Sequence, residues 1–151
     1  MSIGSLYEYF PDKQALLAAL AERHVALAEL EISAALTQPQ SIATLLADLQ
    51  RAILASQRYP SEALELLSER PQGTLQARAA DLRQRALAGI AESLTAYGHP
   101  SAVAHTRAQA VLGAIGDLTV QAWLRDPEGF EPLAAELLGM AVRQCMTNPS
   151  E

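Results

Sequence analysis

The sequence is poor in cysteine, in aromatic residues and in positive charge. Cys145 is the only cysteine among 151 residues, so an intrachain disulfide and a cysteine-based zinc site are excluded, and a reducing compartment is favoured. Aromatic residues make up 5% of the chain and β-branched residues are sparse beside Ala and Leu, which disfavours sheets. The formal net charge of −6 gives no general attraction to phosphate backbones or anionic lipid.

Long apolar runs and targeting signals are missing as well. No stretch approaches the roughly 20 apolar residues that span a bilayer. The N-terminus lacks the basic and apolar regions of a signal peptide. We therefore expect a cytoplasmic protein without a membrane partner, large enough at 151 residues to form a single core.

Helix-forming residues dominate what is present, and Pro, Gly and capping residues divide them into about seven segments. The expected helices span 2–9, 12–36, 41 to the break at 59–60, 61–70, 75–97, 101–125 and 130–145. Asp12 and Ser41 are suited to cap the second and third of these helices. Because the connections are short, the sequence predicts an all-α bundle of antiparallel neighbours.

Apolar spacing predicts which faces of the longer helices are buried. In helix 12–36 the expected stripe is Leu16, Leu20, His24 and Leu27, and in helix 75–97 it is Leu75, Ala79, Leu82, Ala86, Ile90, Leu94 and Tyr97. Helix 101–125 has one apolar face with Val103, Val111, Ala114 and Leu118, and a second with Ala108, Leu112, Ile115 and Trp123. The last helix has a broad face with Phe130, Leu133, Leu137, Ala141 and Cys145. Both of these last helices therefore require partners.

The first 17 residues contain a long and specific motif. It reads Ser2-Ile3-Gly4-Ser5-Leu6-Tyr7-Glu8-Tyr9-Phe10-Pro11-Asp12-Lys13-Gln14-Ala15-Leu16-Leu17. The motif resembles the stretch that joins the recognition helix to the core in TetR-family transcriptional regulators. The remaining chain resembles that family in architecture only. The resemblance implies a repressor that responds to a small, largely apolar effector and binds operator DNA as a homodimer.

The resemblance divides the chain into residues 1–13, a remnant of a helix-turn-helix domain, residues 14–146, an effector-binding and dimerisation domain, and a flexible tail at 147–151. It implies DNA contacts for Ser2, Ser5, Tyr7, Tyr9 and Lys13, while the upstream helices that hold a recognition helix are not in this sequence. The charges of Glu8, Asp12 and Lys13 sum to 1 − 2 = −1 over residues 1–13. We therefore expect negligible DNA affinity from these 151 residues alone.

Small residues in helix 101–125 favour close approach of another helix. Gly113-Ala114-Ile115-Gly116 lacks the Lys-Ser/Thr of a phosphate loop, so helix packing is its better role. The dimer-forming helices of the family are its last two. The resemblance thus assigns the dimer interface to Gly113, Gly116, Phe130, Leu133, Leu137 and Ala141.

Five side chains are candidates for the effector cavity, each with a structural alternative. His24 interrupts an apolar helix face. It is either a residue of the cavity or a hydrogen-bonded histidine of the core. Tyr59, Tyr97 and Trp123 offer flat apolar area with a polar group, which suits a small-molecule cavity or simple core packing. Arg78 lies seven residues before Arg85, and the pair favours an anionic effector or forms a solvated face.

Catalytic and metal motifs are not found. No serine lies in a Ser-His-Asp pattern, and the three histidines share no ligand spacing with each other or with Cys145. His99, in a Gly-His-Pro turn, is expected to be exposed, and His105 to face solvent or the dimer partner. The sequence predicts neither an enzyme nor a cofactor. A stand-alone helical protein that binds small molecules or a partner, without DNA, is the alternative function.

Overall fold

The structure, a computed structural model, describes residues 10–37, 41–56, 73–126 and 128–147. Within these ranges the chain forms five helices and no strand: α2 (Lys13–Thr37), α3 (Ile42–Ser56), α5 (Thr74–Ala96), α6 (Ser101–Arg125) and α7 (Glu131–Met146). The all-α prediction is confirmed. The count of about seven is not matched, because the helices predicted at 2–9 and 61–70 lie outside the described residues.

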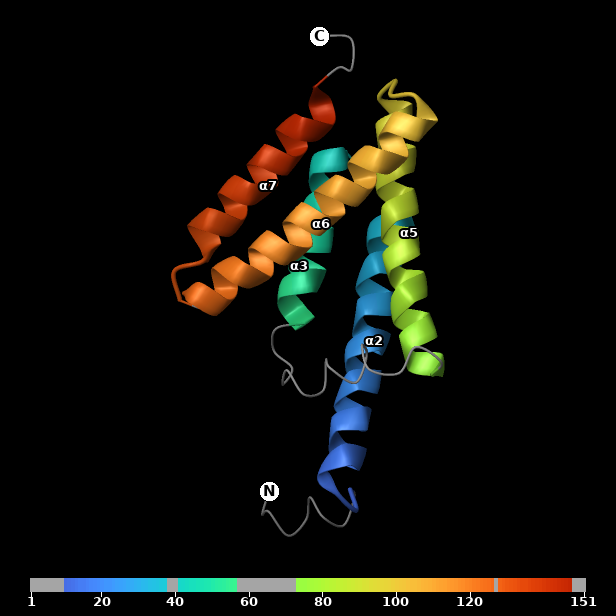
Figure 1. Cartoon of the computed structure of the whole chain (residues 1–151), viewed down its shortest axis with the longest axis vertical. Coiled ribbons are helices and arrows are strands. Elements are labelled where there is room, and N and C mark those ends of the chain that lie inside the picture. Colours follow the sequence, from blue (N-terminus) through green and yellow to red (C-terminus); the bar gives the residue numbers. More distant parts are fainter. Residues whose placement is uncertain (1–9, 38–40, 57–72, 127, 148–151) are drawn as a thin grey trace.

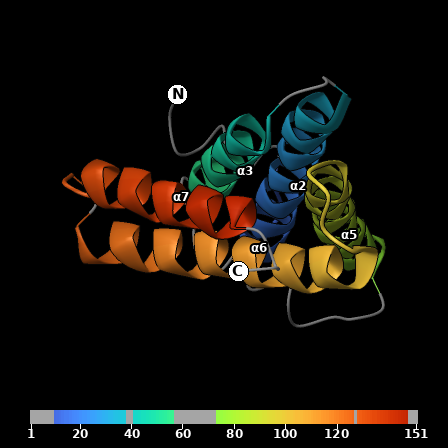
Figure 2. The same cartoon turned by 90° about the horizontal axis from the view of Figure 1, so that it is seen from above.

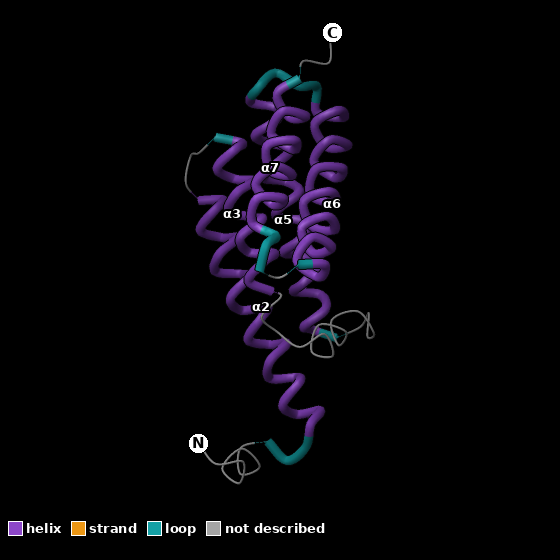
Figure 3. Tube along the Cα trace, turned by 90° about the vertical axis from the view of Figure 1, so that its left-hand side faces the viewer, coloured by secondary structure: helices purple, strands orange, loops and turns teal. Residues whose placement is uncertain are grey.

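The described helices form two layers. Helices α6 and α7 lie side by side and antiparallel in one layer, while α2, α3 and α5 form the other (Figures 1 and 2). Helix α3 packs against all four of the other described helices. The N-terminal turns of α2 project beyond the ends of its neighbours (Figure 3). The core therefore centres on α3, and the beginning of α2 extends away from it.

Both predicted helix caps are present. The Asp12 carboxylate accepts a hydrogen bond from the backbone N–H of Ala15 at 2.7 Å, and the Ser41 hydroxyl accepts one from the N–H of Thr44 at 3.2 Å. Each bond satisfies an N–H that has no partner within the first turn of its helix. The starts of α2 and α3 thus follow from local chemistry.

The buried stripe of α2 is shifted by one position along the helix from the predicted stripe. Leu17, Ala21 and Val25 are buried, whereas Leu27 of the expected stripe is 43% exposed. Leu16, Leu20 and His24 are only partly buried. Because α2 is rich in Ala and Leu on most sides, two neighbouring stripes have the same helical spacing. The positions of α3 and α5, which pack against α2, decide between them.

The other helices follow their predicted stripes more closely, with exceptions near their ends and on one face of α6. Leu82, Ala86, Ile90 and Leu94 of α5 are buried, as are Ala108, Leu112 and Ile115 of α6. Tyr97, at the end of the α5 stripe, is 50% exposed. On the predicted face of α6 that contains Val103, Val111, Ala114 and Leu118, Val111 is buried but Ala114 and Leu118 are exposed.

The turn between α5 and α6 corrects the prediction for His99. Gly98 has a φ of 95°, a left-handed conformation that ends α5 and that glycine adopts without steric cost. This turn directs His99 inward, where its side chain is buried and its Nε2 lies 2.8 Å from the carbonyl oxygen of Cys145. The Gly-His-Pro sequence suggested a solvent-facing turn. Packing of the turn against the end of α7 buries the imidazole instead.

Two groups bind the free carbonyls at the end of α7. Besides His99, the Arg107 guanidinium of α6 donates to the carbonyl oxygens of Gln144 at 3.0 Å and Thr147 at 2.7 Å. The last carbonyls of a helix have no partner within the helix and form its negative end, so a cation there is favourable. These bonds attach α7 to the start of α6.

A buried amide joins the two layers. The Gln50 side chain of α3 is buried, and its Nε2 donates to Thr119 Oγ1 of α6 at 3.1 Å and to the carbonyl oxygen of Ala134 of α7 at 2.9 Å. Both amide hydrogens are thereby used, which removes the cost of burying an unpaired donor. Gln50 sets the position of α3 against α6 and α7.

Candidate functional site

The candidate site is a partly open cavity of about 350 Å³ walled by α2, α3, α5 and α6. Its apolar lining consists of Val25, Ala28, Ile32, Leu49, Ala52, Ile53, Ala79, Leu82, Ala86 and Leu112, with Gly116. His24 and Arg83 are the other described residues of the wall. A mostly apolar hollow with a few polar groups is the usual form of a small-molecule site.

His24 is the predicted cavity residue that the structure brings to this wall. Burial lowers the pKa of its imidazole from the ordinary value of 6.5, because desolvation disfavours the charged form, and the carboxylate of Glu31 opposes this effect. A second hollow of about 440 Å³, lined in part by Arg23 and Glu31, lies beside His24 between α2 and α3. His24 therefore favours its neutral form, in which one ring nitrogen donates and the other accepts.

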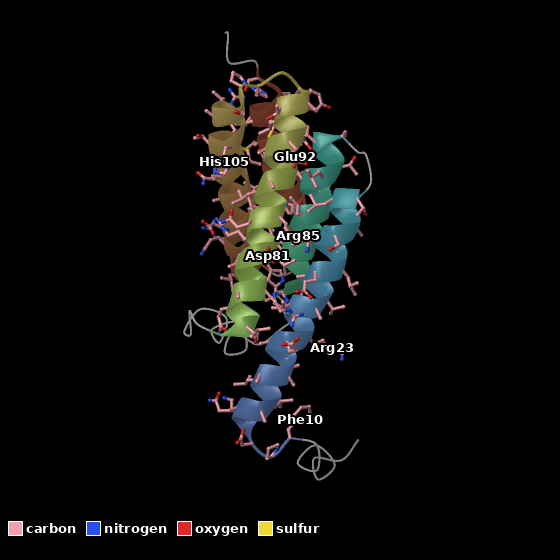
Figure 4. The ribbon with its side chains drawn as sticks, turned by 90° about the vertical axis from the view of Figure 1, so that its right-hand side faces the viewer. Phe10, Arg23, Asp81, Arg85, Glu92 and His105 are labelled. Carbon is pink, nitrogen blue, oxygen red and sulfur yellow. The ribbon has the colours of Figure 1, made fainter. Side chains whose placement is uncertain are left out.

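Arg78 does not line the cavity; it holds α5 against α2. Its guanidinium donates to both carboxylate oxygens of Glu29, at 2.8 and 2.7 Å, and also pairs with Glu22. The hydrogen bond from Arg78 lowers the pKa of the Glu29 carboxyl, and the same bonds raise the pKa of Arg78. Arg85 donates to the Ser33 hydroxyl at 2.8 Å and lies on the side of α5 that faces α2 (Figure 4). The described contacts of both arginines are thus contacts between α5 and α2.

The remaining predicted ligand residues lie elsewhere. Tyr97 is at the exposed end of α5, and Trp123 is partly buried near the end of α6, with neither in the cavity wall. Tyr59 lies outside the described residues, as do Ser2, Ser5, Tyr7 and Tyr9. Lys13 is exposed at the first residue of α2.

A second feature is an open apolar groove of about 330 Å³ between α6 and α7. It is lined by Ala110, Val111, Ala114, Ile115, Leu118, Leu137, Met140, Ala141 and Gln144. Large apolar side chains are exposed in or beside it, including Leu118 at 48%, Met140 at 53% and Leu133 at 42%. Such side chains on two adjacent helices are typical of an interaction surface.

The predicted dimer residues divide between this groove and other places. Leu137 and Ala141 line the groove, and Leu133 is exposed on α7. Gly116 lines the cavity instead, where an added Cβ would lie 3.9 Å from Ile53 Cδ1. An added Cβ at Gly113 would have nothing within 4 Å. Phe130 is half-buried directly before α7.

Other chemistry in the described part of the chain is limited. No group of three or more His, Cys, Asp or Glu side chains there is arranged to hold a metal ion. Cys145 is buried, and burial raises the pKa of its thiol, which disfavours the reactive thiolate. His105 is exposed on α6 (Figure 4). Among the described helices, none has the length and apolar character needed to cross a membrane.

Sequence reasoning missed Arg83 as a cavity residue. Arg83 follows Leu82 and precedes Ala86 by three residues, so it adjoins the predicted buried stripe of α5. Arg78 directly precedes Ala79 and Arg85 directly precedes Ala86, so all three arginines adjoin the same stripe. The sequence therefore contains no signal that singles out Arg83.

Comparison of the sequence with models of known protein families, with curated proteins and with solved structures found no match.

Proposed function

We propose that this chain is the effector-binding and dimer-forming body of a ligand-responsive transcriptional regulator of the TetR family, acting as a repressor. The observation that carries the proposal is the apolar cavity of about 350 Å³ walled by four helices. The motif from Ser2 to Leu17 supports the family, because in TetR regulators the corresponding stretch joins the recognition helix to such a body.

Helix α2 is the element that would transmit binding. It begins inside the motif, projects beyond the bundle, and supplies His24, Val25, Ala28 and Ile32 to the cavity wall (Figure 1). An effector that prefers one position of α2 shifts the population toward that position. The Arg78 pairs with Glu22 and Glu29 hold α2 to α5, so the two helices move together or these pairs break.

The groove between α6 and α7 is proposed as the surface that binds a second copy of the chain. Its apolar residues lie on the two last helices, which are the dimer-forming helices of the family. Two-fold pairing sets the distance between two recognition helices, and that distance must match successive major grooves. An effector that alters it weakens operator binding, and operator DNA weakens effector binding by the same factor.

A fusion protein tests the regulatory part of the proposal. The helix-turn-helix of a TetR-family repressor with a known operator is joined to this chain in place of residues 1–9. We expect the fusion to bind the donor operator as a dimer in a mobility-shift assay, because the body sets the distance between the two recognition helices. The donor helix-turn-helix alone and the unfused 151-residue chain are the controls, and both should fail to shift the operator.

One outcome would favour the alternative function. A fusion that is folded and dimeric, yet does not bind the donor operator, indicates a body that does not space recognition helices. The chain would then be a stand-alone protein that binds small molecules.

A further inference from the structure

The wall of the cavity differs in charge from the protein around it. The whole chain has a formal net charge of −6 with 17 acidic side chains, yet none of the described residues that line the cavity is Asp or Glu. Among the lining residues that the structure describes, His24 and Arg83 are the polar ones. The described part of the wall is therefore apolar, with the cation Arg83 at its edge, in an acidic protein.

Arg83 is distinguished from its neighbours on α5 by its lack of a partner. Arg78 binds Glu22 and Glu29, and Arg85 binds Ser33. Over the described ranges, no hydrogen bond or ion pair engages the guanidinium of Arg83, which is exposed at the edge of the cavity. A guanidinium presents paired N–H donors that match the two oxygens of a carboxylate.

The size and the apolar lining restrict the ligand further. At about 30 Å³ for each water, 350 Å³ corresponds to roughly a dozen waters, which is room for a hydrocarbon body of about ten carbons. A phosphate monoester carries about −1.5 to −2 charges at neutral pH, more than one arginine balances. His24 does not supply a second full charge, because its burial favours the neutral imidazole.

We infer that the cavity binds an apolar carboxylic acid, with its hydrocarbon body between α2, α3, α5 and α6 and its carboxylate at Arg83. The inference rests on the proposed function, which requires only that the cavity bind a small apolar molecule. It adds that the bound molecule is a monoanion and that Arg83 selects it. Arg83 is thus a specificity-determining residue of the cavity.

Three probes with the same ten-carbon chain and different head groups test this inference: decanoate, 1-decanol and decylamine. Binding to the full chain is measured by isothermal titration calorimetry at neutral pH. We expect decanoate to bind at least ~10-fold more tightly than decanol, because of the charge-assisted hydrogen bonds, and decylamine to bind most weakly. The Arg83→Gln variant should lose about tenfold in decanoate affinity and nothing in decanol affinity.

Two further variants separate the head group from the cavity. Arg125→Gln removes an exposed arginine of α6 outside the cavity wall, so it should leave all three affinities unchanged. Gly116→Leu places a side chain in the cavity beside Ile53, so it should weaken decanoate and decanol alike. Circular dichroism and thermal unfolding confirm that each variant is folded.

The outcomes distinguish the two proposals. If decanol binds as tightly as decanoate, or if Arg83→Gln leaves decanoate binding intact, the carboxylate assignment is overturned. Loss of decanol binding in Gly116→Leu would still support the cavity as a ligand site in that case. If no probe binds the wild-type chain, both the inference and the effector-binding function are overturned.

Discussion

The cavity and the groove are similar in size and mostly apolar, but they differ in what surrounds them. The cavity, of about 350 Å³, has walls from four helices and includes Arg83 and His24. The groove, of about 330 Å³, has described lining residues from α6 and α7, and Gln144 is the polar one among them. Helix α6 contributes to both, through different faces.

The difference indicates different occupants. A hollow lined by four helices with a cation at its edge suits a small molecule that has a polar head. An uncharged groove flanked by exposed Leu118 and Met140 suits the apolar face of another helix pair. Apolar content and openness do not distinguish these two hollows, whereas the number of helices around each and the charge at its edge do.

The largest expected effect comes from a charge placed in the groove. Leu118→Glu should raise the dissociation constant of the proposed dimer by ~100-fold or more, because two unpaired carboxylates would be buried in an apolar interface. Sedimentation over a range of concentrations measures the change. The control is Leu30→Glu, the same change at a 69% exposed leucine of α2, which should leave the dimer intact. The groove is not a dimer interface if wild type and Leu118→Glu sediment alike as monomers.

Alanine substitutions at two glycines of α6 form a matched pair, and their expected effects on stability and dimerisation are of intermediate size. Gly113→Ala and Gly116→Ala should each stabilise the fold by about 1 kcal/mol, because alanine favours the helix and neither added Cβ meets a close atom. Gly116 faces Ile53, so we expect Gly116→Ala to leave the dissociation constant of the proposed dimer unchanged. We expect Gly113→Ala to raise that dissociation constant. Urea unfolding at one protein concentration gives the change in the free energy of unfolding, and sedimentation gives the change in the dissociation constant. An unchanged dimer constant for Gly113→Ala would remove Gly113 from the interface.

The smallest expected effect is a pH dependence at the cavity. Burial lowers the pKa of His24 in the folded chain, so the unfolded chain binds the proton more readily. Stability from this group is present above the ordinary value of 6.5 and is lost as the pH falls below it. The urea midpoint should therefore fall more between about pH 7.5 and about pH 5.5 in wild type than in His24→Gln. Equal changes in both proteins would show that His24 is not desolvated.

Much of the fold could be predicted because its signals are local. Asp12 and Ser41 bind N–H groups within three residues, and Gly98 ends α5 through its own backbone conformation. Such interactions form between neighbours in the chain and need no information from distant segments. The all-α class and the approximate helix bounds follow from them.

The candidate site could be predicted only in part. His24 was identified because it interrupts an apolar stripe, but the stripe that is buried is the neighbouring one, with Leu17, Ala21 and Val25. Arg83 was missed because its neighbours on α5 gave no reason to prefer it to Arg78 or Arg85. Which stripe of α2 is buried and which arginine of α5 lines the cavity both depend on the side of the helix that packs against another helix.

Within the described ranges, the sequence by itself determined which segments are helices, roughly where they begin, and that several faces are apolar, since hydrogen bonding and steric restriction act between near neighbours. Only the tertiary structure decided that His99 is buried against α7, that Gln50 bonds to both α6 and α7, and which arginine lines the cavity. Those results depend on the relative rotation of helices far apart in the chain. A rotation of one residue, about 100°, exchanges a cavity residue for a solvent-facing one.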